Sequence, residues 1–251
     1  MITLTASKFI CILFNKDSSV EALEERFPFL VIVKVTTFSN EKYWCNGVII
    51  KEDCVLTSAN CVSGAFRLAS KVTLSSLSLE GSDKNGRTIS FHDIYLHPNY
   101  DPVTGENDLA IVRLNETVSS EKLIGIVSEV TNTQKNCDVG SPLLVGYHRI
   151  HKGLNIMDSF DVHIMSESQD NNNCEQMLHE TQLDVVLRDS ELCITNDEGK
   201  QVYITDILVQ KQCGKYMLIG LVTHNNIVTR AGYYMNWINR WIKPISTITS
   251  F

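Results

Sequence analysis

Short apolar runs separated by polar turn residues dominate the pattern of this chain, and long helical stripes are rare. The runs are rich in Val, Ile, Leu and Phe, and Gly, Asn, Asp, Ser and Pro lie between them. Runs of this kind are typical of the strands of an all-β protein. We interpret the following residues as strands: 30–36, 45–50, 54–58, 72–79, 89–95, 109–114, 142–147, 154–164, 183–187, 202–209 and 216–223.

The number and spacing of these runs suit two six-stranded barrels that meet near residue 125. All-β chains of 251 residues often form a single unit of this size. Helix is expected mainly after Tyr234, with a second short helix near residues 173–179. No internal repeat is visible.

Composition excludes several function classes. The net charge is −7 and no Lys/Arg-rich run exists, so nucleic-acid binding has no electrostatic support. No apolar run approaches the 18 or so residues of a membrane span. Hydrophobic residues make up 43% of the chain, which is enough for a sizeable core.

Five groups of motifs resemble the chymotrypsin-like (trypsin-like) serine proteases. Residues 45–50 (C-N-G-V-I-I) and 56–61 (L-T-S-A-N-C) resemble the family's C-G-G-S-L-I and V-L-T-A-A-H-C. The others, in family order, are F-P-F-L-V at 27–31, L-H-P-N-Y-D at 96–101 with N-D-L-A-I-V-R-L at 107–114, L-I-G-L-V-T at 218–223, and A-G-Y-Y at 231–234 with W-I-N-R-W-I at 237–242. The resemblance implies an all-β chymotrypsin-like fold of two six-stranded antiparallel Greek-key barrels with a C-terminal helix.

The same resemblance sets the expected domain bounds. A protease-like domain covers residues 17–251, with a first barrel at about 27–125, a second at about 126–235 and a helix at about 235–243. Residues 1–16 are interpreted as a possible signal peptide, because the apolar core at 9–14 follows Lys8. The alternative is a disordered or strand-forming leader.

Asn60 stands where the family has its catalytic His. An imidazole titrates near neutral pH and accepts a proton from a hydroxyl nucleophile, whereas a carboxamide does not. Asp108 matches the family's buried aspartate that orients this His; the plainer alternative is an aspartate at a strand start. We expect Asn60 and Asp108 to lie side by side, with the Asn60 amide donating to the carboxylate, because a buried carboxylate needs donors.

The family's nucleophile segment, G-D-S-G-G-P, has no counterpart. Residues 194–212 contain no serine, and only the last two residues of 202–209 (V-Y-I-T-D-I-L-V) match the family's L-V. The β-branched residues there favour a strand over a tight turn that aims N–H groups at an oxyanion. Thr205 is a candidate replacement nucleophile, but no base at Asn60 would activate it. Nucleophile and oxyanion hole are therefore both expected to be absent.

Eight cysteines lie at positions 11, 45, 54, 61, 137, 174, 193 and 213, without C-x-x-C metal spacing. An even count does not by itself establish pairing. The resemblance implies three disulfides, Cys45–Cys61, Cys174–Cys193 and Cys137–Cys213, and hence an oxidising compartment. Cys54 is expected to be a buried free thiol, and the state of Cys11 stays open.

The remaining polar candidates carry no catalytic prediction. His97 belongs to the H-P-x-Y turn, and the histidines at 148, 151, 163, 179 and 224 show no metal-ligand spacing. Residues 223–225 (T-H-N) replace the family's S-W-G, which predicts a polar, remodelled substrate wall. Asn115, in N-E-T, is a candidate for glycosylation. No metal or cofactor is expected.

These observations predict a secreted, monomeric, non-catalytic serine protease homologue (a pseudoprotease) of a class abundant in insects. It would act as a binding or regulatory protein, for example in an extracellular proteolytic cascade. Expected partners are extracellular proteins such as proteases, zymogens or inhibitors, with no nucleic acid and no membrane span. The alternative, which family membership alone suggests, is a serine-type endopeptidase.

Overall fold

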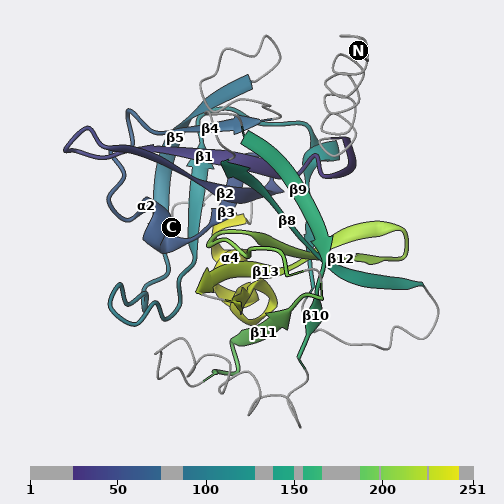
Figure 1. Ribbon diagram of the computed structural model, residues 1–251. Coiled ribbons are helices and arrows are strands. Elements are labelled where there is room, and N and C mark those ends of the chain that lie inside the picture. The colour runs from purple at the N-terminus through teal and green to yellow at the C-terminus, as the bar shows by residue number, and fades with distance from the viewer. Residues whose placement is uncertain are drawn as a thin grey trace, which may run out of the picture.

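The computed structural model describes residues 25–74, 87–127, 138–149, 155–165, 187–197, 199–224 and 226–242. Two curved, barrel-like sheets pack against each other, and a short helix lies at the C-terminal end (Figure 1). The predicted fold class is confirmed. The leader, the expected helix near 173–179 and the cysteines at 11, 137 and 174 lie outside the described residues.

The first barrel contains six strands and closes on itself in the order β1-β2-β3-β6-β5-β4, as expected. All its pairings are antiparallel. The strands are β1 Leu30–Thr36, β2 Lys42–Lys51, β3 Cys54–Thr57, β4 Lys71–Leu74, β5 Arg87–Leu96 and β6 Ala110–Leu114.

The second sheet differs in strand number from the six that we expected. It has eight strands, because the two-residue strands β7 and β10 join it, and β7 pairs parallel to β13. The main path runs β10-β11-β14-β13-β12-β8-β9. The bounds are β7 Gly125–Ile126, β8 Val139–Arg149, β9 Asn155–Asp161, β10 His163–Ile164, β11 Glu191–Thr195, β12 Ile207–Gln212, β13 Lys215–His224 and β14 Ile227–Arg230.

Three strands, β7, β11 and β14, were missed, and one was predicted too long. β11 and β14 are short and pair with each other, and their other edges pair with β10 and β13 respectively. β12 begins at Ile207, so the strand predicted over 202–209 is wrong at its start. The helical segments are α2 Ala59–Val62, the 3₁₀ turns η1 Ser120–Lys122 and η2 Ala231–Tyr234, and α4 Met235–Ile242.

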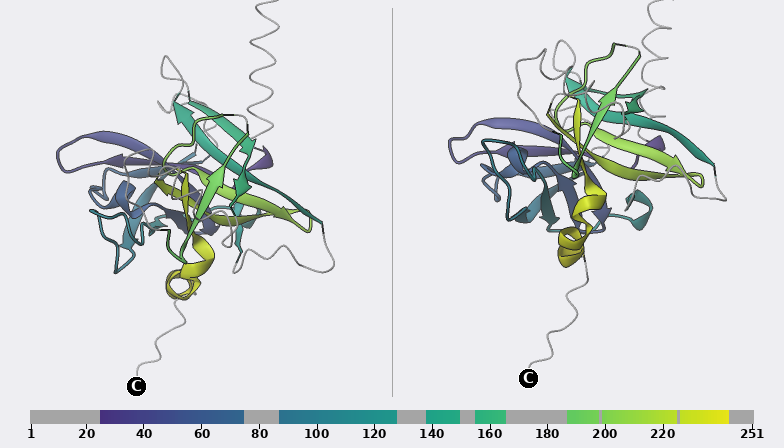
Figure 2. Two further views of the ribbon diagram at one scale, coloured as in Figure 1. Left: turned by 60° about the horizontal axis from the view of Figure 1, so that its bottom comes forward. Right: turned by 90° about the horizontal axis from the view of Figure 1, so that it is seen from below.

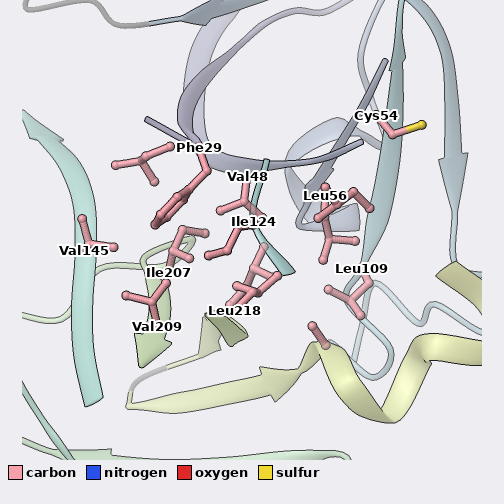
Figure 3. Packing of buried hydrophobic residues seen from close by; sticks show 14 of the residues in the cluster. Phe29, Val48, Cys54, Leu56, Leu109, Ile124, Val145, Ile207, Val209 and Leu218 are labelled. Atoms are coloured by element: carbon pink, nitrogen blue, oxygen red, sulfur yellow. The ribbon is translucent and has the colours of Figure 1, made fainter. Parts of the chain in front are cut away.

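The largest apolar cluster lies between the two barrels. Phe29, Val48 and Leu56 of the first barrel meet Ile207 and Leu218 of the second (Figure 3). Helix α4 closes one end of this interface, where Trp237 and Ile238 are buried in the same cluster; Figure 2 shows the helix, in yellow, beside the junction of the sheets. Burial of such side chains contributes about 1.5–3 kcal/mol each, so this contact fixes the barrels relative to each other.

Candidate functional site

The carboxylate of Asp108 is the centre of the first part of the site. It is buried, with 2% of the residue exposed, directly before β6. The Ser58 hydroxyl lies 2.8 Å from both carboxylate oxygens, and the backbone N–H of Asn60 donates to Oδ1 at 2.7 Å. Burial raises the pKa of the Asp108 carboxyl, and the bonds from Asn60 and Ser58 oppose that rise.

Asn60 lies beside Asp108, but the predicted contact through its side chain is wrong. Asn60 is exposed at the start of α2, and its amide oxygen accepts a long bond of 3.5 Å from the Tyr100 hydroxyl. The donors to the carboxylate are instead the Ser58 hydroxyl and the Asn60 backbone. Ser58 is also the N-cap of α2, since its Oγ accepts from the Cys61 N–H at 3.3 Å. A serine donor thus replaces the imidazole that the family pattern places next to the aspartate.

His224 lies near enough to this carboxylate to act on its charge. Its imidazole is packed onto Gly105, where an added Cβ would lie 2.0 Å from the ring, and its charge lowers the pKa of Asp108. Gly105 also has a φ of +71°, which favours glycine. The polar substrate wall at 223–225 stays a prediction, and Asn225 lies outside the described residues.

Residues 203–206, where the resemblance places the nucleophile segment, form a tight turn and not a strand. The Asp206 N–H donates to the Tyr203 carbonyl at 3.0 Å, and Thr205 has a φ of +73°. A left-handed conformation is unusual for a β-branched residue. Strand propensity therefore gave the wrong answer at Thr205, because the tertiary contacts of the turn outweigh it.

Three backbone donors of this turn are already in use. The Tyr203 N–H donates to Asp206 Oδ2 at 2.9 Å, the Thr205 N–H to the Val222 carbonyl at 2.7 Å, and the Asp206 N–H closes the turn. An oxyanion hole needs free donors aimed at the position where charge develops. These three N–H groups bind protein acceptors instead.

A buried polar cluster anchors the turn to both barrels. Asp206 is fully buried and lies 2.8 Å from His148 Nε2 on β8. Asn46 on β2 donates from Nδ2 to Asp206 Oδ1 at 3.3 Å, and its backbone N–H donates to Thr205 Oγ1 at 2.9 Å. Burial raises the pKa of the Asp206 carboxyl, and the hydrogen bond with His148 opposes this. We call Asn46, His148, Thr205 and Asp206 the inter-barrel clamp.

Sequence reasoning missed most of the clamp. His148 shows no metal-ligand spacing, so the sequence predicts no role for it. In the structure it is buried against Asp206, and the centroid of its ring lies 4.4 Å from that of Tyr203. The sequence holds one signal for the clamp and one for the cluster around Asp108. Asn46 replaces the first glycine of C-G-G, and Ser58 replaces the first alanine of T-A-A-H-C. Gly146 permits the clamp, because an added Cβ there would lie 2.2 Å from Asp206 Oδ1.

The disulfides agree with the expected framework where it is described. Cys45 and Cys61 are joined, which ties β2 to α2. Cys193 and Cys213 are each disulfide-bonded, and their expected partners lie outside the described residues. Cys54 is a free, buried thiol, as predicted, and burial raises its pKa to about 12.

The other candidates lie apart from the clamp. His97 packs edge-on against Tyr234 and Trp237, with ring centroids 5.1 Å apart, and burial lowers its pKa. Asn115 is exposed just after β6, and its Nδ2 donates to the Phe91 carbonyl at 3.2 Å. Within the described ranges, no group of His, Cys, Asp and Glu side chains could hold a metal ion. No described helix is long and apolar enough to cross a membrane.

Comparison with known proteins gives one family. The family model described as Trypsin matches residues 18–206. Mouse "Vitamin K-dependent protein C" is 26% identical over 225 residues, which are 81% of this chain and 47% of that protein. "Serine protease filzig" of Drosophila melanogaster is 23% identical over 84% of this chain and 13% of its own length. The chain thus spans less than half the length of these two relatives.

Two further comparisons concern proteins closer to this chain in length. "Brachyurin" of Leptuca pugilator is 25% identical over 72% of this chain and 74% of its own. A solved structure described as "Structure of GrC" has a TM-score of 0.65, 18% identity, and coverage of 87% of this chain and 95% of its own. At that identity the structural likeness supports the chymotrypsin-like fold alone.

Proposed function

The chain belongs to the trypsin-like serine protease family, and we propose that it is a member without catalytic activity that acts as a binding or regulatory protein. The observation that carries this proposal is the turn at 203–206. It offers no serine, its N–H groups at Tyr203, Thr205 and Asp206 bind protein acceptors, and it is fixed to both barrels by the clamp.

The base side of the site supports the same proposal. Asn60 cannot take a proton from a hydroxyl at neutral pH. Thr205, the candidate replacement nucleophile, is buried with 5% exposed, and its Oγ1 already accepts from the Asn46 N–H. The nearest imidazole of the clamp, His148, faces the Asp206 carboxylate. Within the clamp, no base is thus directed at the Thr205 hydroxyl.

The setting that we propose is extracellular. Disulfides at Cys45–Cys61, Cys193 and Cys213 are typical of an oxidising compartment. Partners would be extracellular proteins, such as proteases, zymogens or inhibitors. The insect-type assignment is part of the proposal and is supported by the Drosophila relative. Because the relatives in the comparison are named as proteases, a serine-type endopeptidase is the competing function.

One experiment separates the two. The purified, disulfide-bonded protein is treated with a fluorophosphonate probe and, in parallel, with chromogenic peptide and ester substrates. An active family member under the same conditions is the positive control. We expect neither labelling nor turnover above background. Covalent labelling that heat denaturation abolishes, or inhibitor-sensitive turnover, would establish the endopeptidase instead.

A further inference from the structure

A buried thiol lies where the end of helix α4 meets the first barrel. Cys54, at the start of β3, is a free cysteine without exposed surface. Its Sγ lies 3.3 Å from Asp53 Oδ1 and 4.0 Å from the carbonyl oxygen of Trp241 on α4. In Figure 3 the Cys54 sulfur points away from the other labelled side chains of the apolar cluster. The thiol therefore faces a polar contact between β3 and α4, apart from both Asp108 and the inter-barrel clamp.

Arg113 on β6 holds the end of α4 against the barrel. The last four carbonyl groups of an α-helix have no partner within the helix. The Trp241 carbonyl is one of these, because α4 ends at Ile242. Arg113 donates from Nη2 to this carbonyl and from Nη1 to Asp53 Oδ2 at 2.7 Å. A positive charge at this end of a helix is also favoured by the helix dipole. Arg113 thus joins α4, β6 and the turn before β3 at one point.

The two ends of α4 are held differently. Trp237 and Ile238 are buried in the largest apolar cluster, whereas Trp241 is partly buried against it. The Trp241 ring stacks on that of Tyr95, with centroids 3.8 Å apart. Among the described residues, the Nε1–H of Trp241 and the Nε–H of Arg113 are buried and have no hydrogen-bond partner. Buried donors without acceptors cost stability. The last turn of α4 should therefore open before the rest of the helix.

The closed arrangement suppresses the chemistry of the thiol. Thiol–disulfide exchange needs a thiolate that can reach the sulfur of a disulfide. Burial raises the pKa of Cys54 to about 12, and the nearby charge of Asp53 adds to the rise. At neutral pH the closed thiol is thus both protonated and covered. Opening of the last turn of α4 admits water and reagent to the sulfur together.

We propose that the last turn of α4, residues 239–242, is a latch that keeps Cys54 out of thiol–disulfide exchange, and that its release lets Cys54 react with small disulfides. In that reaction the Cys54 thiol gives its proton to water and the thiolate attacks one sulfur of the disulfide. A mixed disulfide forms, and the second sulfur leaves as a thiolate. This device goes beyond the proposed function and does not depend on the loss of catalysis.

The test measures the reaction of Cys54 with 4,4′-dithiodipyridine in the full, disulfide-bonded chain. Release of 4-thiopyridone gives the rate at several urea concentrations below the unfolding transition. Peptide mass spectrometry assigns the modification to Cys54 rather than to Cys11, Cys137 or Cys174, and Cys54→Ala is the blank. We expect reaction through local opening, so the logarithm of the rate should rise with urea at less than about a third of the slope for global unfolding.

Variants of the latch change this rate in a defined order. Arg113→Met should raise it by about tenfold or more with the same shallow urea slope, because the Trp241 carbonyl loses its donor. Arg113→Lys keeps the charge but lacks the fork that reaches two acceptors, so its rate should lie between those of the parent and Arg113→Met. Arg240→Met, at an exposed position of the same helix, is the matched control and should react as the parent does.

A second contact keeps the proposal testable if Arg113→Met does not fold. Tyr95→Leu removes the stack on Trp241 and should also raise the rate at Cys54. A urea slope equal to that of global unfolding would show that no latch opens locally. The proposal would also be overturned by the absence of Cys54 modification below the unfolding transition, or by equal rates in the latch variants and Arg240→Met.

Discussion

At the residue scale, the Ser58 hydroxyl contacts Asp108, whereas in the family pattern an imidazole makes this contact. Its hydroxyl reaches both carboxylate oxygens at 2.8 Å while its oxygen caps α2. Without this donor, a carboxyl that is 2% exposed would keep only backbone partners. The site is thus stabilised as a structural hydrogen-bond network, and the exposed Asn60 side chain contributes little to it.

The Ser58→Ala variant should therefore be destabilised by about 1–3 kcal/mol, from the lost bond to a buried carboxylate and the lost helix cap. Asn60→Leu is the matched control, because the Asn60 contact with Asp108 runs through the backbone. Its stability should stay within about 0.5 kcal/mol of the parent. Urea denaturation measures both. A larger loss in Asn60→Leu than in Ser58→Ala would contradict this assignment of donors.

The adjacency of Asn60 and Asp108 could be predicted from sequence, because both lie in motifs with strong family counterparts. The side-chain donor to the Asp108 carboxylate could not be predicted, because the direction of a side chain depends on the backbone around it. Ser58 shows this: its replacement of an alanine is visible in the sequence, but its geometry relative to Asp108 is set by the end of β3 and the start of α2.

At the scale of elements, the inter-barrel clamp joins β2 of the first sheet to β8 and the 203–206 turn of the second. Asn46 is central: its Oδ1 accepts from the Tyr147 N–H at 2.8 Å, and its Nδ2 donates to Asp206. It is 1% exposed. The clamp supplements the apolar interface and fixes the turn at 203–206.

Asn46→Ala should cost about 2–3 kcal/mol, because it leaves the Tyr147 N–H without its acceptor and removes one donor to Asp206. Asn236→Ala, at an exposed position of α4, is the control and should change stability by less than about 0.5 kcal/mol. Chemical denaturation gives both values. If the two variants unfold at the same denaturant concentration, Asn46 does not couple the barrels.

The clamp also gives a pH dependence. Burial raises the folded-state pKa of Asp206 above its ordinary 3.8, with nearby Asp158 adding to the rise and His148 opposing it. The stability that this group contributes is complete below that ordinary value and is lost as the pH rises through the raised pKa. The unfolding free energy of the parent should therefore fall relative to that of Asp206→Asn as the pH rises above about 4. Parallel profiles for the two proteins would show that Asp206 does not titrate in this way.

The sequence predicts some strands of this fold and misses others, depending on how much of each strand's stability comes from its own residues. Long alternating or apolar runs such as β1 and β13 were found, because the pattern itself specifies them. β11 and β14 were missed, since strands this short depend on pairing with the strands on both sides of them. The turn at Thr205 was predicted as strand because its stabilising partners, Asn46 and Val222, are distant in sequence. His148 and Asp206, 58 positions apart, could be paired only by the fold.

At the scale of the whole molecule, catalysis in this fold needs one contribution from each barrel. The first must supply a base beside Asp108, and the second a nucleophile with free backbone donors. In this chain Ser58 and Asn60 lie on the first side, and the turn at 203–206 lies on the second. The proposed loss of catalysis is therefore a property of the assembled interface.

The last prediction follows from this. Asn60→His alone should show no turnover, and neither should the double variant with Ser58→Ala, which frees the Asp108 oxygens for a new imidazole. Triad members act as a unit, so a base without a nucleophile restores nothing measurable. The oxyanion hole, which in active enzymes leaves a residual acceleration of about 10³–10⁴ after loss of a triad member, is also expected to be absent. Both variants are assayed with peptide and ester substrates and with the fluorophosphonate probe, against the parent as baseline. Inhibitor-sensitive turnover in either would mean that a hydroxyl elsewhere in the chain can serve as nucleophile, and that only the base was missing.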